Sequence, residues 1–323
     1  YGLSDNDDNV HHFLKSGAVS QLMSGEFHVQ ASKDCVKNTL KKLEEKIAQG
    51  HVLSHLKGIL AQLDASDSHM SKHYIASGLA FLAPQHSLYS IFIEHGGLDV
   101  LLESALNHGC KKCQREGIDA VHTLGKKVSA FNDLPTVENG FKPGQVVQSH
   151  KKCLGGMYLN NPEMSDVHFQ VDGKGVYAHK LALLSASSEF AKILEQQEHE
   201  VSLGMDVLRY VYTGTCDVNG KNAQSLLVDA EEFKLNGLKF AAETFLVQNV
   251  KEENLFETFE LATRTNAAHL KKAACHMLLK EWQSISQSSS QECTKQKLEQ
   301  MLGELRDILK NKCCLSTPSA AAR

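Results

Sequence analysis

The sequence contains few of the residues that mark non-globular or membrane-spanning chains. Only 5 of its 323 residues are proline and 22 are glycine, which excludes collagen-like and low-complexity chains. Its apolar runs are all much shorter than the roughly 20 residues that a membrane-spanning helix needs. The basic excess typical of nucleic-acid-binding domains is also missing, since 34 Lys and Arg stand against 38 Asp and Glu. We therefore expect neither membrane insertion nor direct nucleic-acid binding.

The composition is that of an ordinary globular protein, with 42% hydrophobic and 22% charged residues. At about 150 residues per domain, the length predicts roughly two domains. The first ten residues carry a run of Asp and Asn and lack the apolar stretch of a signal peptide. An odd count of 9 cysteines without such a signal favours a reducing compartment, so we expect a cytoplasmic or nuclear location. Because the sequence starts at Tyr1 and not at Met, we expect a fragment.

The first part of the chain shows helical periodicity and a longer repeat. Residues 31–49 contain no proline or glycine, and their apolar residues recur every three or four positions, which predicts an amphipathic helix. Gly17, Gly58 and Gly96 each precede a short apolar run, and they are spaced by 41 and 38 residues. This period is typical of armadillo and HEAT repeats, in which a glycine allows the tight turn between helices.

Three segments resemble parts of armadillo repeats. Residues 12–19 (HFLKSGAV) and 93–102 (IEHGGLDVLL) are similar to the start of an armadillo third helix, and residues 60–83 are similar to an armadillo loop followed by a second helix. The resemblance covers about residues 10–128 and implies an all-α, armadillo-like solenoid over residues 1–130. Another all-helical domain is the alternative. Residues 131–156 are rich in Pro, Gly, Asn and Asp, which predicts a linker.

From Met157 the pattern changes to a mixture of strands and helices. Apolar and polar residues alternate before the turn signal Asp172-Gly173, which predicts a β-hairpin. We expect strands at 166–171, 176–178 and 200–203, and helices at 207–212, 221–233 and 236–247. We also expect one helix from His179 onward, with Leu181, Leu184, Phe190 and Leu194 as its buried positions.

The same region resembles a BTB (POZ) domain. The matching blocks are MSDVHFQV (164–171), VYAHK (176–180), LLSASSEF (183–190), LRYVYTG (208–214) and LLVDAEEF (226–233), in the family's order. The resemblance implies an α/β domain at 157–250, followed by BACK-like or 3-box-like helices at 251–285. The predicted fold class is therefore α+β multidomain, with an all-α solenoid, a BTB domain and a helical extension.

The resemblance also implies function by contact. BTB domains commonly homodimerise and often dock onto the cullin-3 scaffold of ubiquitin ligases. Positions that shape the fold and the dimer side are matched by Asp166, His179, Ser187 and Phe190, and the candidate cullin contacts are Ile193, Glu195 and Tyr212. The segment between Phe190 and Tyr212 is shorter than is usual in the family, so residues 191–207 put cullin docking in question.

The sequence lacks a recognisable catalytic constellation. Cys110-x-x-Cys113, with His108 before it and His122 after it, has the spacing of half a zinc site, but a second pair of ligands does not accompany it. We therefore interpret the motif as the junction of a loop and a helix. Phosphate-binding loops and nucleophile elbows are also missing, so we expect no enzyme, no cofactor and no metal.

The tail, residues 286–323, combines a serine-rich joint with an amphipathic pattern over 292–310. We favour a last packed helix of the C-terminal domain over a partner-binding or coiled-coil helix.

Our first hypothesis is a non-catalytic adaptor. Its armadillo part would bind a client protein, with Asn107, His108 and His122 as candidate contacts, and its BTB part would dimerise and recruit a cullin-3-type scaffold. The second hypothesis is a BTB scaffold or transcription co-regulator that binds no cullin. The third is an enzyme with an unrecognised site.

Overall fold

The computed structural model divides the chain into two compact units. Unit 1 comprises Tyr1–Asp133 and Leu278–Arg323, and unit 2 comprises Leu134–Met277. The structure describes residues 2–6, 9–25, 27–48, 69–82, 86–106, 109–135, 146–148, 153–171, 174–195, 204–288 and 292–315. Among these residues, no helix is long and apolar enough to cross a membrane.

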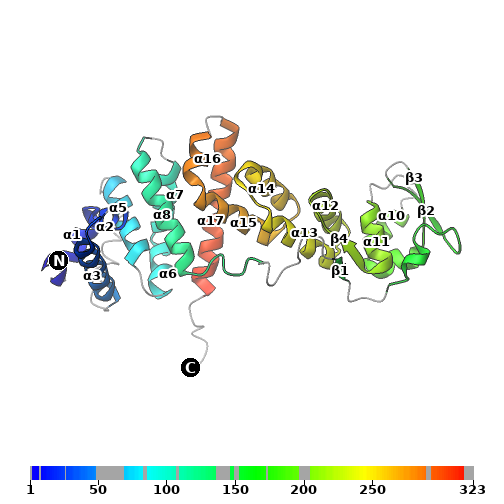
Figure 1. Cartoon of the computed structure of the whole chain (residues 1–323), viewed down its shortest axis with the longest axis horizontal. Helices are drawn as coiled ribbons and strands as arrows, with labels where there is room; N and C mark the ends of the chain where they lie inside the picture. The colour runs from blue at the N-terminus through cyan, green and yellow to red at the C-terminus, as the bar shows by residue number, and fades with distance from the viewer. Residues whose placement is uncertain are drawn as a thin grey trace, which may run out of the picture. The chain divides into compact units, whose positions relative to one another are not determined.

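Unit 1 is helical throughout its described part (Figure 1). Its elements are η1 (Gly2–Asp5), α1 (Asn9–Lys15), α2 (Ala18–Ser24), α3 (Gln30–Ala48), α5 (His69–Leu82), α6 (His86–Glu94), α7 (Gly97–Leu106), α8 (Lys111–Lys127), α16 (Trp282–Ser288) and α17 (Glu292–Leu315). The core lies where α5 packs against α7 and α8, and α5 is buried from His73 to Ala80 apart from Tyr74. Stacked helices of this kind agree with the armadillo-like architecture predicted from the sequence.

Two of the three predicted glycine turns lie in the described residues. Gly17 precedes α2 with φ of +74°, and Gly96 precedes α7 with φ of +75°. Both angles are in the left-handed region, which glycine adopts without strain. At Gly17 a Cβ atom would also lie 2.8 Å from the ring of Tyr74. Gly58 lies outside the described residues.

The tail helix α17 belongs to unit 1. It packs against α6 and α7, with Leu298, Met301, Leu302, Leu305 and Leu309 buried. Arg306 Nε lies 2.6 Å from Asp99 Oδ1 of α7. The structure thus differs from the favoured expectation that this helix closes the C-terminal domain. The apolar stripe predicted the helix correctly, but a stripe does not reveal which surface it covers.

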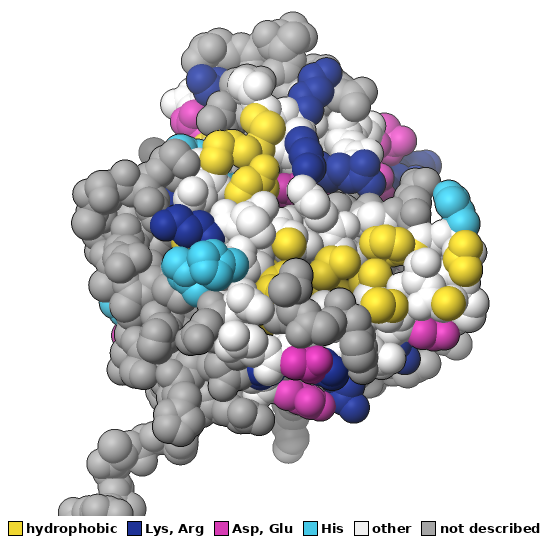
Figure 2. Space-filling view, turned by 90° about the vertical axis from the view of Figure 1, so that its left-hand side faces the viewer, with side chains coloured by type: hydrophobic (Ala, Val, Ile, Leu, Met, Phe, Trp, Pro, Cys, Tyr) yellow, Lys and Arg dark blue, Asp and Glu magenta, His cyan; other side chains and the backbone are white. Residues whose placement is uncertain are grey.

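The first helices of unit 1 leave apolar side chains exposed. Figure 2 views this end, where hydrophobic side chains gather among lysine, histidine and acidic side chains. Met23 of α2 is 44% exposed, and Val29, just before α3, is 63% exposed. This end therefore differs from the polar outer face of a repeat that caps a solenoid.

Unit 2 combines two short antiparallel ladders with a series of helices. In the part that the structure describes, β1 (Val146–Gln148) pairs with β4 (Thr215–Asp217), and β2 (Val167–Val171) pairs with β3 (Lys174–Ala178). Its helices are η2 (Gly156–Tyr158), α9 (Lys180–Ala186), α10 (Phe190–Glu195), α11 (Met205–Thr213), α12 (Ala223–Glu232), α13 (Asn236–Gln248), η3 (Glu252–Asn254) and α14 (Leu255–Arg264). Helix α15 (Ala268–Lys280) carries the chain back to unit 1.

Unit 2 follows the predicted pattern except in the linker and in the helix after His179. Val146–Gln148 lie within the predicted linker, yet they form β1, because Val147 aligns opposite Cys216 in the distant strand β4. The hairpin forms as expected, but the single helix predicted from His179 divides into α9 and α10. Phe190 is buried as predicted, whereas Leu181 and Leu184 are exposed. The predicted strand at 200–203 and the turn residues Asp172 and Gly173 lie outside the described residues.

Candidate functional site

The centre of unit 2 is a contact between two residues that the sequence singles out separately, His179 and Tyr212. Tyr212 lies on α11 and is fully buried, and His179, which precedes α9, is 7% exposed. The Tyr212 hydroxyl lies 2.7 Å from the backbone nitrogen of His179 and 2.9 Å from its ring Nδ1. This contact ties the start of α9 to α11.

The hydrogen-bond pattern fixes the direction of these contacts. His179 Nε2 lies 3.1 Å from the carbonyl oxygen of Glu163, so Nε2 carries the ring proton and donates it. Nδ1 is then an acceptor, and the Tyr212 hydroxyl donates to it while accepting from the His179 backbone N–H. Burial raises the pKa of Tyr212, and the hydrogen bond from the His179 backbone opposes part of that rise. The histidine is therefore a structural bridge in this fold.

Asp166 and Ser187 fix the two ends of α9. Asp166 Oδ1 accepts the first helical N–H, from Lys180, at 2.7 Å. Ser187 follows the helix, and its Oγ accepts the N–H of Glu189 at 3.2 Å, which turns the chain into α10. Both side chains satisfy backbone donors that a helix start leaves without partners.

Phe190 anchors α10 in the core. Its ring is 1% exposed and stacks on Phe233 with a centroid separation of 4.6 Å and an interplanar angle of 5°. Phe233 follows α12 and is 2% exposed. The stack therefore joins α10, at the start of the shortened segment, to α12 after it.

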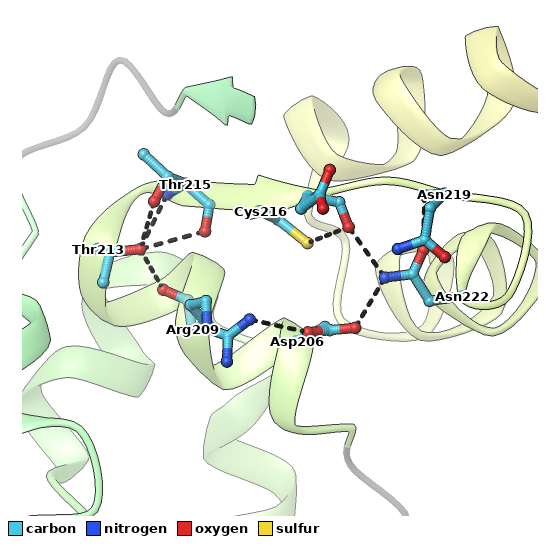
Figure 3. A network of polar contacts seen from close by, with 8 residues as sticks. Asp206, Arg209, Thr213, Thr215, Cys216, Asn219 and Asn222 are labelled. Atoms are coloured by element: carbon cyan, nitrogen blue, oxygen red, sulfur yellow. Dashed lines mark hydrogen bonds and ion pairs between the residues drawn. The ribbon is translucent and has the colours of Figure 1, made fainter. Parts of the chain in front are cut away.

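A polar network holds the turn after α11 (Figure 3). The Thr213 hydroxyl accepts the N–H of Thr215 at 3.1 Å. The Asn222 amide donates to Asp206 Oδ2 at 2.8 Å and to the carbonyl oxygen of Asp217 at 2.9 Å. These bonds tie α11, β4 and the start of α12 together, and so they fix the edge on which β1 pairs.

The candidate cullin contacts occupy different environments. Glu195 ends α10 and is exposed. The side chain of Ile193 lies outside the described part of the chain. Because Tyr212 is fully buried and its hydroxyl is occupied by His179, its side chain is not presented to a partner. Tyr212 is thus a fold residue and not a contact residue.

Unit 2 exposes several large apolar side chains. Leu181 and Leu184 lie three residues apart on α9, and so on one helix face, and they are 74% and 44% exposed. Met157 is 77% exposed and Met164 is 85% exposed. Because Leu181 and Leu184 share one helix face, they are the candidates here for an interaction surface.

A cleft of about 540 Å³ lies between α12 and α14. Its lining residues are Gln224, Ser225, Val228, Glu257, Glu260, Leu261 and Arg264. A cleft with charged and apolar walls suits a protein segment better than an apolar small molecule.

The Cys110-x-x-Cys113 motif opens helix α8. Cys110 is the residue before the helix, and its sulfur accepts the N–H of Cys113 at 3.3 Å. His122 lies further along the same helix and is partly buried, and burial lowers its pKa. No group of three or more His, Cys, Asp or Glu suited to a metal occurs within the described ranges. Of the candidate client contacts, Asn107 and His108 lie outside the described residues.

The sequence pattern indicates neither of two polar residues that tie elements together, Glu243 and Asn222. Glu243 of α13 is 5% exposed, and its Oε1 accepts the N–H groups of His269 and Leu270 at 2.6 and 3.0 Å, which caps α15. Asn222 ties three elements together, as described above. A polar residue in an apolar helix pattern was the available signal for Glu243, but its partners lie 26 and 27 residues away.

Comparisons with known proteins agree with this geometry. The BTB/POZ domain model matches residues 156–250. The Arabidopsis thaliana protein named "ARM repeat protein interacting with ABF2" is 32% identical over 280 residues, which cover 83% of this chain and 38% of that protein. "Armadillo BTB Arabidopsis protein 1", from the same plant, is 32% identical over 301 residues, which cover 90% of this chain and 39% of that protein. The chain thus spans about two fifths of the length of these relatives. The predicted resemblance and fold class are confirmed.

Proposed function

Because this chain combines an armadillo-like unit with a BTB/POZ domain, we propose that it is a non-catalytic adaptor. Unit 1 binds a client protein, and unit 2 dimerises and docks onto a cullin-3-type scaffold. The observation that carries the proposal is the BTB/POZ domain at 156–250, whose helix α9 exposes two leucines on one face. The name of one relative records an interaction with ABF2, which supports a protein as the client.

Self-association is the first step to test. Burying Leu181 and Leu184 against a second copy would remove apolar surface from water, at about 25 cal/mol per Å². We expect the Leu181→Glu/Leu184→Glu double variant to elute as a monomer while the unchanged chain elutes as a dimer. Size-exclusion chromatography with light scattering measures the mass directly.

Phe240→Glu is the matched control for dimerisation. Phe240 lies on α13 of the same unit and is 44% exposed, the same exposed fraction as Leu184. Its replacement should leave the dimer intact. Weak interfaces usually have dissociation constants of about tens of micromolar. If the unchanged chain is still a monomer at that concentration, self-association is contradicted.

Cullin docking needs a separate measurement, because residues 191–207 are short for the family. Immobilised cullin-3 N-terminal domain should retain the unchanged chain and should retain Glu195→Lys less well, since Glu195 is exposed at the end of α10. Glu299→Lys, on exposed α17 surface, is the control. Absence of binding at about tens of micromolar would favour the alternative, a BTB scaffold or transcription co-regulator without cullin.

A cytoplasmic or nuclear location belongs to the same proposal. The chain holds nine cysteines, an odd number, and Cys35, Cys110, Cys113 and Cys216 are free thiols. An odd cysteine count with free thiols supports a reducing compartment.

A further inference from the structure

The adaptor role leaves the Cys110-x-x-Cys113 motif unexplained. Cys110 takes the N-cap position of α8, with φ of −137° and ψ of 92°, and its sulfur accepts the N–H of Cys113 at 3.3 Å. Ser, Thr, Asp or Asn usually fill this position, because an oxygen caps a helix better than a sulfur does. Here a sulfur caps the helix, and the N–H that it accepts belongs to a second cysteine. This cap is therefore chemically different from the usual oxygen cap.

The surroundings favour a thiolate at Cys110. The N-terminus of a helix carries a partial positive charge, which favours a thiolate there. Hydrogen bonds from the Cys113 side chain and backbone lower the pKa of Cys110, and burial and the Glu116 carboxylate oppose part of that lowering. Cys110 is also partly exposed, so a reagent in solution can reach it.

Cys113 has the opposite character. It is 5% exposed, and burial raises the pKa of its thiol to about 12. Its sulfur contacts Met70 Sδ of α5 at 3.7 Å. One accessible thiol with a lowered pKa therefore lies beside one buried thiol with a raised pKa.

The backbone geometry allows the two sulfurs to join. Residues three apart on a helix are neighbours, roughly 5–6 Å apart between Cβ atoms. The extended backbone at Cys110 turns its side chain further toward Cys113, as the 3.3 Å contact between Sγ and the Cys113 nitrogen records. A disulfide needs Cα atoms about 4.4–6.8 Å apart, so closing it requires rotation of the Cys113 side chain and little movement of the backbone.

We propose that Cys110 and Cys113 are a redox-responsive dithiol that closes into an intramolecular disulfide. The Cys110 thiolate attacks a low-molecular-weight disulfide such as glutathione disulfide, forms a mixed disulfide and releases one glutathione thiolate. Cys113 then gives up its proton and attacks the Cys110 sulfur, which releases the second glutathione. Two protein thiols are oxidised, and one glutathione disulfide is reduced to two glutathione molecules.

Closing the disulfide changes the contact between α5 and α8. The Cys113 sulfur contacts Met70 Sδ at 3.7 Å and must move closer to the Cys110 sulfur to bond with it, so this contact between the two helices changes. One turn further along α8, the buried Glu116 carboxylate lies 3.5 Å from the buried ring of His73 of α5. The oxidised form therefore alters the packing of α8 against α5, the core of unit 1.

The test uses the full chain in buffers with graded ratios of reduced glutathione to glutathione disulfide. After quenching by alkylation, mass spectrometry of the peptide that contains both cysteines should show the loss of two hydrogens and no alkyl group as the ratio falls. Cys35, an exposed cysteine on α3, is the internal reference and should be alkylated or carry glutathione. If Cys110 and Cys113 both stay reduced in glutathione disulfide alone, the proposal is overturned.

Two variants separate the roles of the sulfurs. Cys113→Ala keeps an apolar side chain in the core and should accumulate a glutathione adduct on Cys110. Cys110→Ser keeps a capping side chain, so α8 should stay folded by circular dichroism, and Cys113 should form no adduct. A glutathione adduct on Cys113 in Cys110→Ser, or no adduct on Cys110 in Cys113→Ala, would contradict the assigned roles.

Discussion

Replacing Leu305 by alanine is expected to destabilise unit 1 by about 2–5 kcal/mol, the range for deleting a fully buried leucine side chain. Leu305 is 0% exposed in the middle of α17, which packs against α6 and α7. The cavity would lie between a helix from the end of the chain and two from its first half. Thermal or denaturant unfolding measures the loss of stability.

Hydrogen exchange shows which helices lose stability. In Leu305→Ala, the backbone amides of α6 and α7 should lose protection, whereas those of α12 and α13 in unit 2 should keep theirs. Val29→Ala is the control, because a valine 63% exposed should change stability by about 0.5 kcal/mol or less. Loss of protection confined to unit 2 would show that α17 closes the C-terminal domain after all.

The second large effect is expected at Tyr212. Tyr212→Phe keeps the ring but removes the hydroxyl, which leaves the His179 N–H and Nδ1 buried without this partner. Each buried polar group that loses its partner costs about 1–3 kcal/mol. Tyr177→Phe is the matched control, since Tyr177 lies on β3 and is 40% exposed. Equal stability of the two variants would refute the bridging role of the hydroxyl.

The Tyr212 hydroxyl also predicts a dependence on pH. Burial raises its pKa in the folded state, so the neutral phenol is favoured there. The stability from this group is fully present below the unfolded-state pKa of about 10 and is lost as pH rises through the higher folded-state pKa. The difference between the unchanged chain and Tyr212→Phe should therefore narrow above about pH 10, as unfolding curves at several pH values would show.

Local sequence signals predicted the parts of the fold that depend on near neighbours. Gly17 and Gly96 were identified from their spacing, and both adopt the left-handed conformation that a tight turn uses. The alternation of apolar and polar residues before His179 predicted the β2–β3 hairpin, whose two strands are consecutive in the sequence. In each case the residues that decide the structure are a few positions apart.

Long-range contacts decided the rest, and the local pattern carries no information about them. Val146–Gln148 become a strand because β4 offers an edge far along the chain. Tyr212 was assigned to a partner surface from the family pattern, although its hydroxyl is occupied by His179 in the interior. The apolar stripe of α17 is evident in the sequence, but an amphipathic helix can pack on any apolar face of suitable shape. The stripe therefore does not predict which helices α17 contacts.

The discontinuity of unit 1 sets an order of events during synthesis. The first segment of this unit ends at Asp133, whereas the helix that covers α6 and α7 begins at Glu292. At about 5–20 residues per second, the ribosome needs roughly ten to thirty seconds to make the chain between them. All of unit 2 emerges in that interval. The apolar surface of α6 and α7 that α17 covers in the folded protein stays uncovered during this time. A chaperone that shields this surface until α17 emerges would therefore protect the nascent chain from aggregation.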